Sequence, residues 1–167
     1  RNVLRLGYRH IDTAEAYENE DAVGEGIRSS GVDRDEIFVT TKFQKKWHGR
    51  ESVRRALEGT LGRLGLDEID LYLVHWPNPD QDRYLEACQG LEDLRSEGKL
   101  RNWGVSNFKP HHLQKVLAAG LRPQVNQISV NPYGQQLSLQ YYNNDHDVLT
   151  AAYSPLGRGN KLFDEPV

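Results

Sequence analysis

The chain has 167 residues, of which 37% are hydrophobic and 27% are charged, a globular composition that can bury a core within one domain. The formal net charge is −3 with no Lys- or Arg-rich block, which disfavours a nucleic-acid partner, and no apolar stretch approaches the roughly 20 residues that cross a bilayer, which disfavours a membrane. The single cysteine, Cys88, can form no disulfide within the chain, so we expect a cytoplasmic location.

Six short apolar runs recur at intervals of 22 to 34 residues, which is the spacing of a strand, a crossover helix and the next strand. The runs begin near Tyr8, Ile37, Leu71, Trp103, Val125 and Val148. Several of them, such as IFVTT and LYLV, are nearly continuous rather than alternating. Continuous runs are typical of parallel strands covered on both faces, so the sequence predicts a parallel sheet.

Helical patterns fill the intervals between the runs. Residues 53–64 place valine and leucine on one helix face, and Gly65 follows as the expected C-terminal cap. A second helix is predicted over 84–94, and a third begins at Pro110, where a missing N–H is tolerated. No low-complexity linker interrupts the series, so we expect residues 1–167 to form one domain.

Six βα units in one direction fit either an open doubly wound sheet or a (β/α)8 TIM barrel. A barrel needs eight strands and about 250 residues, so this chain would hold about six of the eight strands. The opening stretch RNVLRLG is expected to be the tail of an earlier helix, and a further strand and helix are expected beyond Val167. The chain is therefore predicted to be part of a longer protein.

Four side chains of different chemistry lie at or just beyond the ends of the first three predicted strands. Asp12 ends the first run, Tyr17 follows five residues later, Lys42 ends the second run and His75 ends the third. Taken singly, they could be a capping carboxylate, a tyrosine on an amphipathic wall, a solvated lysine and a core histidine. Because parallel strands deliver their carboxyl ends to one edge, their coincidence favours an active site.

Six longer stretches cover nearly the whole chain: GYRHIDTAEAYENE, TTKF, DLYLVHWP, GVSNF, VNQISVNPY and YSPLGRG. These stretches, in this order, resemble the aldo-keto reductase family. The resemblance is greatest to bacterial members of the 2,5-diketogluconate reductase type. It implies a (β/α)8 barrel that reduces a small or sugar-derived aldehyde or ketone to an alcohol, with NADPH, or alternatively NADH, as the cofactor.

The resemblance also implies the roles of the four side chains. Tyr17 would be the general acid, Lys42 would lower the pKa of its phenol, and Asp12 would hold the buried ammonium. A neutral His75 would orient the carbonyl oxygen. Opposite charges about 4 Å apart interact by roughly 4 kcal/mol at an effective dielectric of 20, against about 1.4 kcal/mol per pKa unit, so one lysine could supply the shift.

Further positions are implied to bind the cofactor. These are Ser106, Asn107, Gln127, Tyr153, Ser154, Leu156 and Gly157. The first three would hydrogen-bond the nicotinamide carboxamide, the tyrosine would stack on the ring, and the last three would meet the pyrophosphate. Without the four side chains above, an ordinary turn, a buried amide and a core tyrosine would explain these residues equally well.

In the family, a tryptophan that lines the substrate pocket often follows the strand that ends with the lysine. This chain has Gln44 near that position and so departs from the family. Trp47 and Trp76 are expected to line the substrate pocket instead. The residues that would select NADPH over NADH are expected beyond Val167.

The histidines show no metal-binding spacing, so no metal is expected. Two alternatives to an active reductase stay open: a cofactor-binding regulatory or scaffold subunit, and an inactive truncated fragment. The full-length protein is expected to be a monomer.

Overall fold

The computed structural model describes residues 2–157, in which all six predicted runs form strands of one sheet. The strands are β1 (His10–Asp12), β2 (Phe38–Phe43), β3 (Leu71–Val74), β4 (Asn102–Ser106), β5 (Val125–Ser129) and β6 (Leu149–Tyr153). They are paired in chain order, and each neighbouring pair is parallel. The predicted parallel sheet is therefore confirmed.

Helices occupy the crossovers between the strands. The α-helices are α1 (Asn2–Arg5), α2 (Glu20–Arg28), α3 (Ser52–Leu64), α4 (Tyr84–Ser96), α5 (Pro110–Ala118) and α6 (Leu137–Asp145). The short 3-10 helices are η1 (Glu15–Tyr17), η2 (Arg34–Glu36) and η3 (Lys45–Trp47). Among the described residues, no helix has the length and apolar character needed to span a bilayer.

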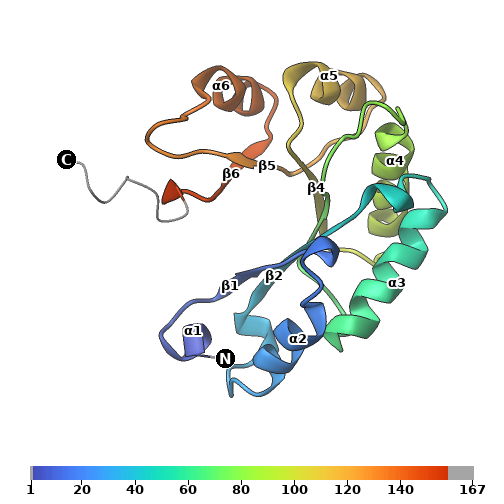
Figure 1. The fold of residues 1–167 in the computed structure, drawn as a ribbon. Coiled ribbons are helices and arrows are strands. Elements are labelled where there is room, and N and C mark those ends of the chain that lie inside the picture. Colours follow the sequence, from blue (N-terminus) through green and yellow to red (C-terminus); the bar gives the residue numbers. More distant parts are fainter. Residues whose placement is uncertain (1, 158–167) are drawn as a thin grey trace.

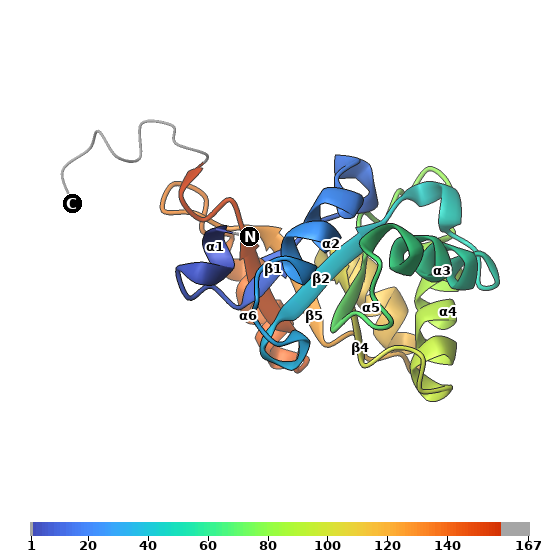
Figure 2. The same cartoon turned by 90° about the horizontal axis from the view of Figure 1, so that it is seen from below.

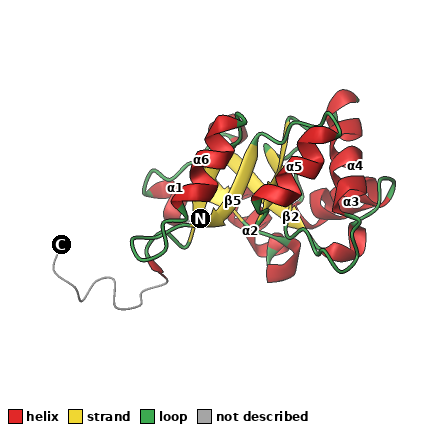
Figure 3. Ribbon diagram, turned by 90° about the horizontal axis from the view of Figure 1, so that it is seen from above, coloured by secondary structure: helices red, strands yellow, loops and turns green. Residues whose placement is uncertain are grey.

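The sheet curls, with the larger helices along its outer side (Figure 1). Figure 2 and Figure 3 show the same arrangement from below and from above. The curl brings β5 near the end of β1, where Nε2 of Gln127 donates a hydrogen bond to Oδ2 of Asp12 at 2.6 Å. A curled sheet of six parallel strands is part of a (β/α)8 barrel, so the barrel prediction is confirmed and the open doubly wound sheet is wrong.

The central strands are buried on both faces, as their continuous apolar runs predict. All four residues of β3 are buried, and Trp103 of β4 and Phe43 of β2 have no exposed surface. Side chains from the inner faces of the helices, including Val53, Leu64 and Leu91, complete the core. Burial of apolar surface on both sides of the sheet fixes the positions of the strand ends.

Helix boundaries follow the predicted caps. Gly65 ends α3 in the left-handed conformation with a φ of 60°, and its N–H donates to the carbonyl oxygen of Leu61 at 2.8 Å. Pro110 is the first residue of α5. One predicted boundary is wrong: β1 begins at His10 rather than near Tyr8, because α1 ends in a turn at Gly7 and Tyr8 is 64% exposed.

Helix α2 packs closely against the end of α3 at Gly24. A Cβ atom at this position would lie 1.8 Å from the carbonyl oxygen of Leu64, well inside contact distance. The absence of a side chain at Gly24 permits this close packing of the two helices. The contact holds in place the helix that follows the Tyr17 turn.

We expect Gly24→Ala to lower the free energy of unfolding by at least about 2 kcal/mol, because the added methyl group must push α2 away from α3. The measurement is urea unfolding followed by circular dichroism. Gly62→Ala is the matched control, since a Cβ at Gly62 of α3 would meet no atom within 4 Å. That variant should gain about 0.5–1 kcal/mol from helix propensity, and equal effects of the two substitutions would contradict the packing argument.

Candidate active site

The ammonium of Lys42 is buried near the carboxyl end of β2, where its side chain is 1% exposed. In the register of the sheet Asp12 lies opposite Thr40, and Lys42, two residues further on, points to the same face as Thr40. Nζ of Lys42 forms an ion pair with Oδ1 of Asp12 and donates to the carbonyl oxygen of Thr13 at 2.9 Å. Because a buried ammonium without partners is costly, this pair fixes β1 against β2.

Tyr17, at the end of η1, lies between Lys42 and His75. Nζ of Lys42 is 5.3 Å from the centre of the Tyr17 ring, and the His75 ring meets it edge-on with 5.9 Å between ring centres. Tyr17 is 51% exposed, so its phenol is accessible to a ligand. With Asp12, these side chains form one group at the carboxyl edge of the sheet, and their catalytic roles stay predictions.

His75 directly follows β3 and is held neutral by its surroundings. Burial, and after it the nearby charge of Lys42, lower the pKa of His75 to about 4, although Asp12 partly opposes them. At pH 7 the imidazole is therefore uncharged, with one ring nitrogen as a hydrogen-bond donor. A neutral donor beside a buried ammonium avoids the repulsion that a second cation would create.

Asn107 connects the ends of three strands. It follows β4 with a left-handed backbone, with a φ of 64°, which asparagine tolerates better than most residues. Its Nδ2 donates to the carbonyl oxygen of His75 at 3.1 Å and to Oγ of Ser106 at 3.0 Å. The hydroxyl of Tyr153, from β6, donates to Oδ1 of Asn107 at 2.9 Å. Three predicted cofactor residues are thus joined to one another, and Asn107 joins them to His75.

Gln127 connects these residues to Asp12. Its carbonyl oxygen accepts a hydrogen bond from Oγ of Ser106 at 2.9 Å, and its Nε2 donates to Asp12. The resemblance predicts only a cofactor contact for Gln127, and the contact with Asp12 depends on the curl of the sheet. Among the described residues, none donates a hydrogen bond to Oε1 of Gln127, which leaves this acceptor available to a ligand.

Two depressions open at this edge of the sheet, and Trp76 lines both of them. One of about 190 Å³ is lined by Ala16, Gln44, Lys45, His75, Trp76 and Asn78. The other is lined by Trp76, Asn107, Phe108, Lys109, Ile128, Ser129, Gln136, Leu139 and Tyr153. Trp76 lies between the two and is 50% exposed, as a pocket wall requires. The first depression is a candidate substrate site, and the second, which Asn107 and Tyr153 line, is a candidate cofactor site. The two candidate sites meet at Trp76.

Trp47 does not line either depression. It lies in η3, and its indole N–H donates to both carboxylate oxygens of Glu15, at 3.0 and 3.2 Å. Its assignment to the pocket stays a prediction. Sequence reasoning missed Glu15, because a glutamate two residues before Tyr17 looks like an ordinary solvated residue. No signal in the sequence marks its burial.

The predicted pyrophosphate residues form a turn directly after β6. The N–H of Gly157 donates to the carbonyl oxygen of Ser154 at 2.9 Å, and both residues have a positive φ. Leu156, between them, is 61% exposed. The turn lies at the same carboxyl edge as the other predicted residues, and a role in cofactor binding stays a prediction.

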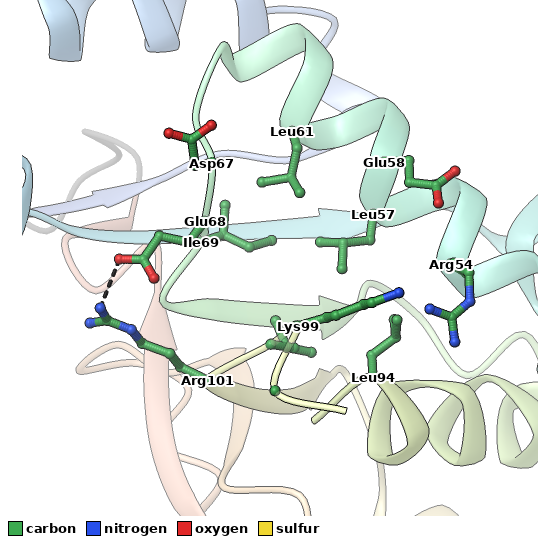
Figure 4. A pocket seen from close by; sticks show the side chains of 12 residues that line it. Arg54, Leu57, Glu58, Leu61, Asp67, Glu68, Ile69, Leu94, Lys99 and Arg101 are labelled. Atoms are coloured by element: carbon green, nitrogen blue, oxygen red, sulfur yellow. Dashed lines mark hydrogen bonds and ion pairs between the residues drawn. The ribbon is translucent and has the colours of Figure 1, made fainter. Parts of the chain in front are cut away.

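Away from this edge the structure has a different groove, before the amino ends of β3 and β4 (Figure 4). Leucine and isoleucine side chains of α3, α4 and the adjoining loops form its floor, and a hydrogen bond from Arg101 to Glu68 crosses its rim at 2.7 Å. Barrel enzymes place their chemistry at the opposite end of the strands, so we assign no catalytic role to this groove. In residues 2–157, no cluster of three or more His, Cys, Asp or Glu side chains could hold a metal ion.

The pKa of His75 predicts how stability depends on pH. It lies at about 4 in the folded protein against 6.5 for the free side chain, so between these values the unfolded chain binds a proton that the folded protein does not. The free energy of unfolding should therefore fall as the pH is lowered from 6.5 towards 4, by at most about 1.4 kcal/mol per pH unit for this group.

Urea unfolding of the protein and of His75→Gln across this pH range measures the contribution of His75. We expect the variant to lose less stability than the parent protein. Some dependence will remain, because burial also lowers the pKa of His48 to about 4. If the free energy of unfolding changes with pH in the same way for both proteins, folding does not hold the imidazole neutral.

Comparison with known proteins identifies relatives over the whole chain. Residues 1–162 match the sequence model described as Aldo/keto reductase family. Methylglyoxal reductase DkgA of Escherichia coli strain K12 is 44% identical over 169 residues, which cover 100% of this chain and 61% of that protein. The 2,5-diketo-D-gluconic acid reductase B of Corynebacterium sp. is 44% identical over 160 residues, covering 95% of this chain and 58% of that protein.

Solved structures agree with these matches. The crystal structure of an aldo-keto reductase of Bombyx mori in complex with NADP superposes with a TM-score of 0.82 at 43% identity, covering 89% of this chain and 52% of that one. The chain thus spans about three-fifths of the length of the curated relatives it matches.

Proposed function

The chain belongs to the aldo/keto reductase family, and on this premise we propose that the protein reduces the carbonyl group of an aldehyde or ketone to an alcohol, with NADPH as the hydride donor. The observation that carries the proposal is the convergence of Asp12, Tyr17, Lys42 and His75 at one strand edge. Relatives named as reductases, and a neighbour solved with NADP, support it.

The residues around His75 fit a nicotinamide. A carboxamide needs both donors and acceptors, and the side chains of Ser106, Asn107 and Gln127 supply both within one hydrogen-bonded group. Tyr153 is half-buried and lines the depression that Trp76 and Asn107 also line, so its ring can stack on a planar group. The turn from Ser154 to Gly157 is our candidate for the pyrophosphate.

A bound reduced nicotinamide supplies a hydride to the carbonyl carbon. The protein supplies the proton: the hydroxyl of Tyr17 protonates the carbonyl oxygen, and the phenolate that remains is stabilised by the ammonium of Lys42. Asp12 keeps that ammonium in place. Neutral His75 donates a hydrogen bond to the same oxygen and orients it.

The substrate is proposed to be a small or sugar-derived carbonyl compound. The depression of about 190 Å³ beside His75 suits a small molecule, and Gln44, Lys45 and Asn78 give it a polar wall. The relatives named for methylglyoxal and for 2,5-diketo-D-gluconic acid act on oxygen-rich carbonyls of this kind. A cytoplasmic location and a monomeric full-length protein stay predictions.

Tyr17→Phe is the direct test of the general acid. Without the hydroxyl the carbonyl oxygen has no positioned proton donor, so kcat should fall by about 10²–10⁴-fold. The Kd for NADPH, measured by quenching of tryptophan fluorescence, should change by less than about threefold. The assay is steady-state NADPH oxidation with methylglyoxal and with 4-nitrobenzaldehyde, on the protein from its complete reading frame.

Tyr8→Phe provides the control, because Tyr8 is 64% exposed and lies outside the group. It should leave kcat unchanged. A near-normal rate in Tyr17→Phe would remove Tyr17 from its proposed role. NADPH binding without multiple turnover in the parent protein would instead favour a regulatory subunit.

Substitution of Tyr153 tests the cofactor site. Stacking of an aromatic ring contributes about 0.5–1.5 kcal/mol beyond its buried area, so Tyr153→Ala should raise the Kd for NADPH by about tenfold. Tyr153→Phe keeps the ring and loses only the hydrogen bond to Asn107, so its Kd should stay within about threefold of the parent value. Titration of fluorescence with NADPH measures both, and equal affinities in the two variants would argue against stacking.

A further inference from the structure

Glu15 is a buried carboxylate beside the candidate active site. It is the first residue of η1, two positions before Tyr17, and its side chain is 8% exposed. Burial tends to raise the pKa of Glu15, but hydrogen bonds from Lys46, Trp47 and the Gln44 N–H outweigh it and hold the pKa below its usual value. Glu15 is therefore a charged anchor at neutral pH.

All the partners of this carboxylate come from one short segment, Gln44–Trp47. Oε2 accepts a hydrogen bond from the backbone N–H of Gln44 at 3.0 Å, Oε1 accepts one from Nε1 of Trp47 at 3.0 Å, and Nζ of Lys46 is 2.7 Å from Oε1. In the described part of the chain, every hydrogen bond or ion pair that joins this segment to another element ends on Glu15. The other backbone bonds of the segment are local, such as that from Trp47 N–H to the carbonyl oxygen of Gln44.

The same segment forms a wall of the depression beside His75. Gln44 and Lys45 line it on one side, together with Ala16, the neighbour of Glu15 in η1. His75 and Trp76 line it as well. The carboxylate thus joins the turn that carries Tyr17 to the segment that a substrate would touch.

We propose that Glu15 is a positioning residue, which holds Gln44–Trp47 against η1 and so sets the width of the substrate pocket. The proposal deepens the reductase function and rests on it. Glu15 acts through the segment it binds and makes no contact with reacting atoms.

The turn that carries Tyr17 has its own supports. Thr13 N–H donates to the carbonyl oxygen of Thr40 at 2.9 Å, its hydroxyl donates to Oδ1 of Asn19 at 2.7 Å, and Ala14 has no exposed surface. Loss of Glu15 should therefore loosen the pocket wall and leave Tyr17 in place. The expected signature is a change in KM and not in kcat.

The first experiment is steady-state kinetics of Glu15→Ala with 4-nitrobenzaldehyde, a substrate large enough to touch the wall. We expect KM to rise by about tenfold, kcat to stay within about threefold, and the Kd for NADPH to stay within about twofold. Glu15→Gln keeps an acceptor oxygen for Gln44 and Trp47 and should restore KM to within about threefold of the parent value. Trp47→Phe should raise KM modestly in the parent protein and have no further effect in Glu15→Ala.

Limited digestion with trypsin gives a readout that needs no activity. The bonds after Lys45 and Lys46 lie within the segment, so Glu15→Ala should be cut there at least about fivefold faster at an unchanged urea midpoint. Glu58→Ala is the matched control, a carboxylate of α3 at the distant groove (Figure 4). It should alter neither KM nor cleavage.

The outcomes separate the two proposals. Unchanged KM and unchanged cleavage in Glu15→Ala would overturn the positioning role. A parallel loss of kcat, cofactor affinity and urea midpoint would also overturn it, because that result indicates a general structural role. A parent protein with no turnover would overturn the reductase function, and the digestion experiment would then decide alone whether Glu15 holds the segment.

Discussion

The buried ion pair between Lys42 and Asp12 is the interaction on which the candidate site depends. An ammonium that is 1% exposed must be paired, and within residues 2–157 its carboxylate partner is Asp12 at the end of β1. Asp12 is held in turn by Gln127 from β5, so three strands meet at one charge. The pair therefore does two things at once: it joins β1 to β2 and, through Asp12, to Gln127 of β5, and it places a cation beside the ring of Tyr17.

The chemistry of the edge follows from how charge is distributed there. One cation is buried and compensated, the imidazole of His75 is kept neutral, and the phenol is exposed. In the proposed mechanism the proton leaves the phenol toward a ligand, because the resulting anion would face Lys42. Asn107 completes the arrangement, since its amide joins His75 to Ser106 and Tyr153, which are proposed to bind the cofactor.

Much of this could be predicted from sequence, and the limits have physical causes. Strands, helix caps such as Gly65, and the placement of Asp12 and Lys42 at strand ends depend on local patterns and on the rule that parallel strands share an edge. Gln127 and Asp12 are 115 positions apart in the sequence, and their contact depends on the curvature of the sheet. No local sequence pattern encodes this curvature. The burial of Glu15 was missed for a similar reason, because its partners come from a segment that folds back onto η1.

The attachment of the Gln44–Trp47 segment has a consequence for how this protein could diversify. The groups proposed to carry out the chemistry lie at strand ends of the sheet, whereas one wall of the pocket is a short connection whose polar contacts with other described elements all end on a single carboxylate. Exchange of that connection, together with its anchor, could retune which molecules are accepted without rebuilding the catalytic machinery. Laboratory evolution aimed at new substrates should therefore randomise Glu15 and the Gln44–Trp47 segment first.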